Sequence, residues 1–86
     1  MTITNNFIKY ELEQLIDDKR LMLSNSRCFI LGIGEYNPKR QYRLSARLKE
    51  IRRSIKTEWL RINPDMRVID FDCWINRELS IGINYV

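Results

Sequence analysis

Residues 39–56, KRQYRLSARLKEIRRSIK, hold the side chains of this chain that are best suited to binding a polyanion. The stretch contains eight of the fifteen Lys and Arg residues and a single acid, Glu50. Arginine grips a phosphate through paired hydrogen bonds, and lysine attracts it as a point charge. Residues 39–61 carry nine cations and two acids, whereas the rest of the chain carries six cations and nine acids. The basic character is therefore local, which predicts a surface for an anionic partner.

Placed on a helix, the cations of this segment flank an apolar stripe on two sides. The first flank consists of Lys39, Arg40, Arg43, Arg47 and Arg61, with Glu50 and Glu58 among them. The i,i+3 pairs Arg47–Glu50 and Glu58–Arg61 are expected to neutralise part of its charge. The second flank consists of Tyr42, Ser45, Lys49, Arg52, Arg53 and Lys56, without an acid. Each pair of like-charged neighbours there opposes the helix by about 0.2–0.5 kcal/mol, which favours an anionic partner as the explanation.

We predict a nucleic-acid-binding surface on this helix. Its members are Lys39, Arg40, Tyr42, Arg43, Lys49, Arg52, Arg53 and Lys56. Lys39 and Arg40 lie in the first helical turn, where the helix dipole favours an anion. We expect RNA rather than DNA, because neither a recognition-helix motif nor a paired half-site pattern is visible. The alternatives are docking on an acidic partner protein and a solvated basic surface without a specific partner.

The residue types give little support to catalysis. The chain has no His, so Cys28 and Cys73 lack a general base and the usual partner of a zinc site. Asp70 and Asp72 would share one face of a strand and could meet a divalent metal, although further acids to complete the site are not evident. We predict a protein that is not an enzyme and uses no metal or cofactor, with a metal-dependent nuclease as the alternative.

The basic segment is predicted to belong to a long second helix. Asn37 is a suitable N-cap, Pro38 suits the first helical position, and Asn63-Pro64 stops the helix. The apolar stripe is predicted to consist of Leu44, Leu48, Ile51, Ile55, Trp59 and Ile62. Their steps of three and four residues place them on the core-facing side.

A first helix is predicted to begin after a cap at Thr4, Asn5 or Asn6 and to end at SNS, residues 24–26. The side chains of Ser and Asn compete there with helical backbone bonds. Residues 27–36 then favour a short strand, because their apolar run is dense and partly β-branched.

The alternation of apolar and polar residues over 67–85 favours a β-hairpin that turns near Asn76-Arg77. In that hairpin Trp74 would lie on the outer face and suggest an interface. The competing interpretation is a short helix over residues 72–79, capped by Asp72, in which Trp74 would be part of the core.

These elements predict an α+β fold in the order α-β-α-β-β, with two helices packed on one face of a small three-stranded sheet. The 86 residues are expected to form a single domain, residues 1–86. Without a signal peptide or a membrane-length apolar run, we expect a cytoplasmic protein with reduced, buried thiols and no membrane partner. A homodimer through the long helix or an open strand edge is compatible with the pattern.

In size, basic character and the stretch KRQYRLSARLKEIRRSIK, the chain resembles small accessory proteins of T4-like bacteriophages. Within that group it is similar to TifA-type antagonists of the ToxN toxin endoribonuclease. The resemblance covers about a fifth of the chain and assigns no role to an individual residue. It implies a non-enzymatic inhibitor of a toxin or host defence enzyme that binds RNA, protein or both, in the cytoplasm of the infected cell.

Overall fold

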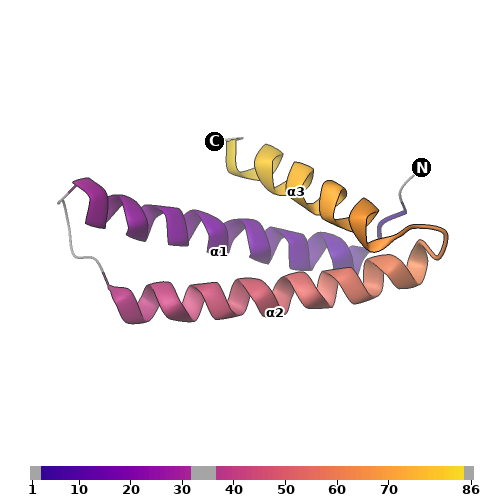
Figure 1. The fold of residues 1–86 in the computed structure, drawn as a ribbon, viewed down its shortest axis with the longest axis horizontal. Helices are drawn as coiled ribbons and strands as arrows, with labels where there is room; N and C mark the ends of the chain where they lie inside the picture. Colours follow the sequence, from indigo (N-terminus) through magenta and orange to yellow (C-terminus); the bar gives the residue numbers. More distant parts are fainter. Residues whose placement is uncertain (1–2, 32–36, 85–86) are drawn as a thin grey trace.

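The computed structural model describes residues 3–31 and 37–84, without the side chains of 27–31. These parts of the chain contain three helices and no strand: α1 is Asn6–Leu31, α2 is Pro38–Ile62 and α3 is Val68–Asn84. Helices α1 and α2 lie antiparallel, and α3 crosses them obliquely (Figure 1). The molecule measures 47 × 24 × 22 Å along its principal axes. The predicted α+β fold is therefore wrong, and the described chain is a small all-α bundle.

Helix α2 has the predicted bounds because its two caps are made of side chains. The Asn37 Oδ1 atom accepts a hydrogen bond from the Arg40 N–H at 3.1 Å, and Pro38 follows it as the first helical residue. At the other end the Asn63 side-chain amide donates to the Trp59 carbonyl at 2.9 Å. The predicted stripe faces the core: Leu44, Ile55 and Trp59 are buried, and Leu48, Ile51 and Ile62 are partly buried.

Helix α1 begins as predicted and continues beyond the predicted end. The Asn5 Oδ1 atom caps it by accepting from the Ile8 N–H at 2.9 Å. Asn25 is buried, and its side-chain amide donates to the Asn37 carbonyl at 3.1 Å and to Gln41 Oε1 at 2.8 Å. This side chain bonds to the start of α2 instead of competing with its own helix. The predicted end at 24–26 is wrong, and so is the strand over 27–31; residues 32–36 lie outside the described residues.

Helix α3 replaces the predicted hairpin. Phe71, Trp74 and Ile75 follow a helical step and are buried, whereas Ile69 and Ile81, inward-facing in the hairpin, are 60% and 55% exposed. The Asp70 carboxylate accepts from the Arg67 N–H at 2.8 Å, half of a capping box that begins the helix. The alternative of a short helix is correct in type but too short, because the helix starts at Val68 rather than at Asp72.

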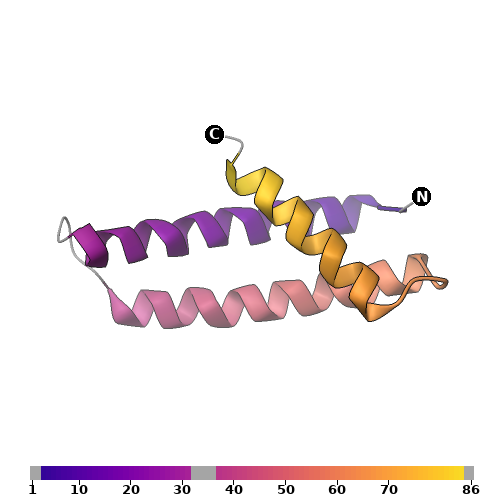
Figure 2. The same cartoon turned by 45° about the horizontal axis from the view of Figure 1, so that its top comes forward.

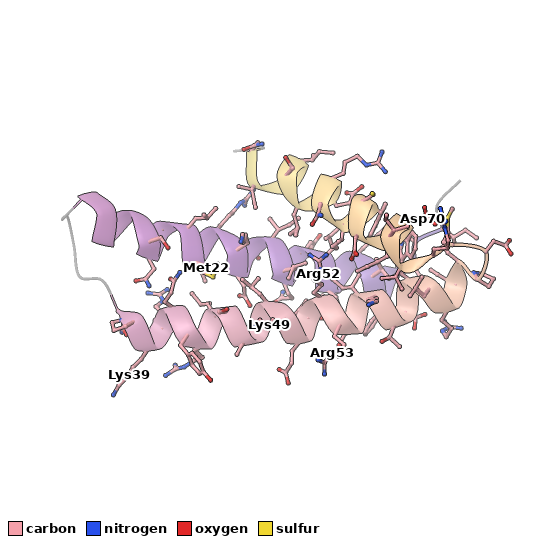
Figure 3. The ribbon with its side chains drawn as sticks, in the orientation of Figure 1. Met22, Lys39, Lys49, Arg52, Arg53 and Asp70 are labelled. Atoms are coloured by element: carbon pink, nitrogen blue, oxygen red, sulfur yellow. The ribbon has the colours of Figure 1, made fainter. Side chains whose placement is uncertain are left out.

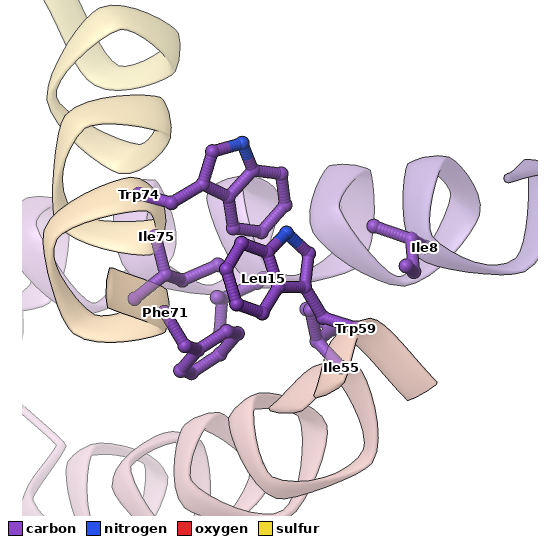
Figure 4. Close-up of a cluster of buried hydrophobic side chains, with 7 residues drawn as sticks. All are labelled: Ile8, Leu15, Ile55, Trp59, Phe71, Trp74 and Ile75. Atoms are coloured by element: carbon purple, nitrogen blue, oxygen red, sulfur yellow. The ribbon is translucent and has the colours of Figure 1, made fainter. Parts of the chain in front are cut away.

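The core lies where α3 crosses the other two helices (Figure 4). Trp59 stacks on Trp74 with ring centroids 5.7 Å apart and meets Phe71 edge-on at 5.6 Å. Trp74 therefore belongs to the core and not to an outer face. Ile8 and Leu15 of α1 and Ile55 and Ile75 complete the cluster.

The position of α3 divides α2 into two parts. Figure 2 shows α3 over the half of the antiparallel α1–α2 pair that contains the C-terminal end of α2, while the N-terminal part of α2 runs beside α1 alone. The basic residues of α2 are thereby placed in two different surroundings.

Candidate nucleic-acid interface

The eight predicted binding residues lie on α2 in two groups. The N-terminal group consists of Lys39, Arg40, Tyr42 and Arg43, and the C-terminal group consists of Lys49, Arg52, Arg53 and Lys56. At 1.5 Å per residue, Lys39 and Lys49 are about 15 Å apart along the helix axis. Lys39 and Arg53 both point away from α1 (Figure 3). The exposed side of α2 therefore carries cations along most of its length.

The N-terminal group is open to solvent. All four of its side chains are exposed, and Tyr42 is 79% exposed. Lys39, Tyr42 and Arg43 line a shallow depression of about 560 Å³ together with Pro38 and Ala46. Within residues 3–31 and 37–84, no acid forms an ion pair with these cations.

The C-terminal group lines a shallow groove between α2 and α3, which we call the basic groove. Its lining residues are Lys49, Arg52, Arg53, Lys56 and Asp72, and its volume is about 270 Å³. Four cations from three successive turns of α2 thus face a space in which Asp72 of α3 is the single acid.

Arg52 differs from the other cations of the basic groove because α3 holds it. Its Nη2 atom lies 3.1 Å from Asp72 Oδ1, and its Nη1 atom donates to Asn76 Oδ1 at 3.5 Å. Its guanidinium also lies 5.9 Å from the centroid of the Phe71 ring, within the range of a cation–π contact. The second flank of α2 carries no acid of its own, but the charge of Arg52 has a partner on α3. In the described part of the chain, Lys49, Arg53 and Lys56 make no ion pair.

The charge of the first flank of α2 is partly neutralised at Arg61, by the predicted pair, and at Arg47, by a different pair. Arg61 bonds to the Glu58 carboxylate as predicted, which lowers the pKa of Glu58 and raises the pKa of Arg61. Arg47 pairs with Asp18 of α1 at 3.2 Å instead of with Glu50, and the Asp18 side chain is only 6% exposed. This flank therefore helps to fasten α2 to α1.

A second cavity adjoins the basic groove and was not predicted. It has a volume of about 140 Å³ and lies between all three helices. Its lining residues are Leu15, Lys19, Leu48, Lys49, Arg52 and Leu79. We call it the leucine pocket. The sequence contains one sign of this pocket: Lys19 takes a place in the series of apolar residues that repeats every three or four positions along α1, so a cation stands on the core-facing side. Asp72 had no such signal, since its meeting with Arg52 depends on the crossing of α2 and α3.

The carboxylates of α3 do not form the paired site considered from the sequence. Asp70 binds Arg67 and Asp72 binds Arg52, and residues two apart in a helix point in different directions. Among the described residues no three His, Cys, Asp or Glu side chains converge on a metal-sized space. Cys73 is a free, exposed thiol, so its predicted burial is wrong, and the Cys28 side chain lies outside the described residues.

Comparisons with protein-family models, curated proteins and solved structures find no match to this chain. The helices in the described residues include none with the length and apolar character needed to cross a bilayer. The assignment of the site therefore depends on its geometry and charge.

Proposed function

We propose that this chain binds RNA through the exposed side of α2 and performs no chemistry on it. The observation that carries the proposal is the basic groove, where Lys49, Arg53 and Lys56 gather beside Arg52 without ion pairs of their own in the described structure. Like charges this close oppose folding unless an anion is bound. A phosphate backbone supplies such anions at regular spacing.

The N-terminal group adds to this surface: Tyr42 lies on the same flank of α2 as the basic groove, and Lys39 and Arg43 lie on the adjoining first flank. Lys39, Arg43 and the exposed ring of Tyr42 supply further cations and an aromatic face, the combination that suits phosphates and unstacked bases. Inhibition of a toxin or host defence enzyme, implied by the resemblance to phage proteins, would use this same surface through the RNA that it holds.

The test measures RNA affinity against salt for the wild type and for Arg53→Gln/Lys56→Gln, which leaves the Arg52–Asp72 pair in place. The matched control is Lys9→Gln/Arg77→Gln, which removes one Lys and one Arg from exposed positions on α1 and α3. With three to five phosphate contacts, log K should fall against log salt with a slope of about −2 to −3.5 for a single strand.

The groove variant should make that slope shallower by about 1.4, since each lost contact contributes about 0.7, and the control should keep the wild-type slope. Failure of the wild type to bind RNA at about 50 mM salt would overturn the proposal. So would equal slopes for the two variants. A protein partner captured after complete nuclease digestion, and lost in the groove variant, would show that the surface serves protein docking instead.

A further inference from the structure

The leucine pocket and the basic groove form one continuous surface, because Lys49 and Arg52 line both. The walls of the leucine pocket are aliphatic: Leu15 from α1, Leu48 from α2 and Leu79 from α3. Its three polar residues are all cations. A ligand that matches this site has an apolar body of limited size and hydrogen-bond acceptors at its edge, and it is joined to anionic groups.

The volume limits that body to about one ring. An enclosed cavity of about 150 Å³ lined by Leu, Ile and Phe side chains accommodates a benzene molecule, and the leucine pocket, which is open to solvent, measures about 140 Å³. A six-membered pyrimidine ring is of this size, whereas the fused rings of a purine are larger.

The charges on the rim select among pyrimidines. Lysine and arginine only donate hydrogen bonds, so Lys19 and Lys49 suit the two carbonyl oxygens of uracil. Cytosine places an amino group, itself a donor, at one of those positions. We propose that the leucine pocket binds one unstacked uracil base of a single-stranded RNA, whose neighbouring phosphates lie in the basic groove.

This inference rests on the proposed RNA binding and adds to it the strand form and the base. In a duplex the bases are stacked and paired, so a base would have to leave the helix at a cost of a few kcal/mol before entering the pocket. A single-stranded loop or end avoids that cost. The two proposals can therefore fail separately.

The experiment compares the binding of three RNAs of about 12 nucleotides, within the usual range of single-strand site sizes. They are an oligouridine, an oligoadenylate and a duplex of mixed sequence. The wild type should bind oligouridine about tenfold more tightly than either of the others, a difference of about 1.4 kcal/mol. Leu79→Phe, which fills the pocket without changing charge, should bring the affinity for oligouridine down to that for oligoadenylate. The control Leu21→Phe makes the same change at an exposed position of α1 and should keep the preference.

A second measurement uses only the wild-type chain and therefore does not depend on the folding of a variant. With labelled leucine methyl groups, NMR should show nuclear Overhauser contacts from Leu48 and Leu79 to the uracil ring protons. Equal affinity for all three RNAs, or contacts absent from these methyl groups, would overturn the uracil pocket and leave RNA binding intact. Absence of all RNA binding would overturn both.

Discussion

Asp72→Asn is the substitution that most directly separates the structural role of the Arg52–Asp72 ion pair from the proposed binding of RNA in the basic groove. Asp72 is the acid of that groove, and its carboxylate lies 3.1 Å from Arg52 Nη2. The two side chains are 47% and 38% exposed. Asparagine keeps the shape of the side chain and one oxygen acceptor but removes the negative charge. We expect the variant to be slightly less stable and to bind RNA more tightly.

The loss of stability should be small. Solvent-exposed ion pairs contribute about 0.2–1 kcal/mol, and this pair lies near the surface. Arg52 keeps its hydrogen bond to Asn76 and its position over Phe71. A loss of about 0.5 kcal/mol corresponds to a fall in Tm of about 2–4 °C for a domain of this size.

The gain in RNA affinity follows from the loss of the negative charge of Asp72, which leaves the Arg52 guanidinium without a partner carboxylate and able to pair with a phosphate. One additional phosphate contact changes the salt slope by about 0.7, so its effect is larger at low salt. At about 0.05 M salt the contact is worth about an eightfold gain, and at about 0.2 M about a threefold gain. The salt dependence of the gain distinguishes a new phosphate contact from a general improvement in folding.

Fluorescence anisotropy with a labelled oligouridine at these two salt concentrations measures both values. Asp65→Asn is the matched control, because Asp65 is exposed in the turn between α2 and α3 and changes the net charge equally. Affinity of the Asp72 variant no greater than that of the Asp65 variant would refute the reasoning. It would mean that Asp72 does not restrain a phosphate-binding side chain.

Three further predictions concern the fold. A Cβ on Gly82 would lie 2.4 Å from Ile16 Cδ1. In an Ile16→Ala background, which removes that contact, Gly82→Ala should raise the free energy of unfolding by about 0.5–1 kcal/mol, because alanine favours a helix more than glycine does. In the wild type the overpacking against Ile16 should cancel that gain or reverse it, as urea denaturation would measure. Asn25→Ala should lower the free energy of unfolding by about 1–2 kcal/mol, because it removes the hydrogen bonds that Asn25 makes to the Asn37 N–H and to Gln41 Oε1 at the start of α2. The hydrogen bond from Arg61 lowers the pKa of Glu58 below its ordinary value of 4.5. The ionised Glu58 therefore stabilises the folded chain above that pH, and this contribution is lost as the pH falls through the folded-state pKa. Glu58→Gln should accordingly lower Tm at about pH 7, and the difference should diminish at about pH 3.

Helix α2 was predictable because local signals agree along its whole length. Asn37 and Pro38 begin it, Asn63 ends it, and its apolar residues repeat only at the helical period. The backbone conformation is therefore specified by side chains within the segment itself. The predicted sides of its cations follow directly from that period, which is why the basic groove contains residues singled out from sequence.

Helix α3 was mispredicted because its apolar residues satisfy two periods. Ile69, Phe71, Cys73 and Ile75 alternate, but Phe71 and Ile75 also lie on one helical face with Trp74. The choice between the two periods was made by packing: Trp74 stacks on Trp59, which belongs to α2. The end of α1 depended in the same way on a partner, since Asn25 bonds to Asn37, the N-cap of α2, and to Gln41 in that helix. Propensity within a segment carries no information about such partners.

Arg52 shows why the proposed RNA-binding surface cannot be tested by removing its cations indiscriminately. Its guanidinium lines the basic groove and the leucine pocket, and it also holds α3 through Asp72, Asn76 and Phe71. Arg52→Ala would weaken RNA binding either by removing a charge or by displacing α3 and deforming both cavities. Loss of binding in that variant therefore has two explanations. Arg53 and Lys56 make no ion pair with α3 in the described chain and do not line the leucine pocket, so their removal changes the charge of the basic groove and leaves that pocket in place. A loss of binding in those variants would have one explanation.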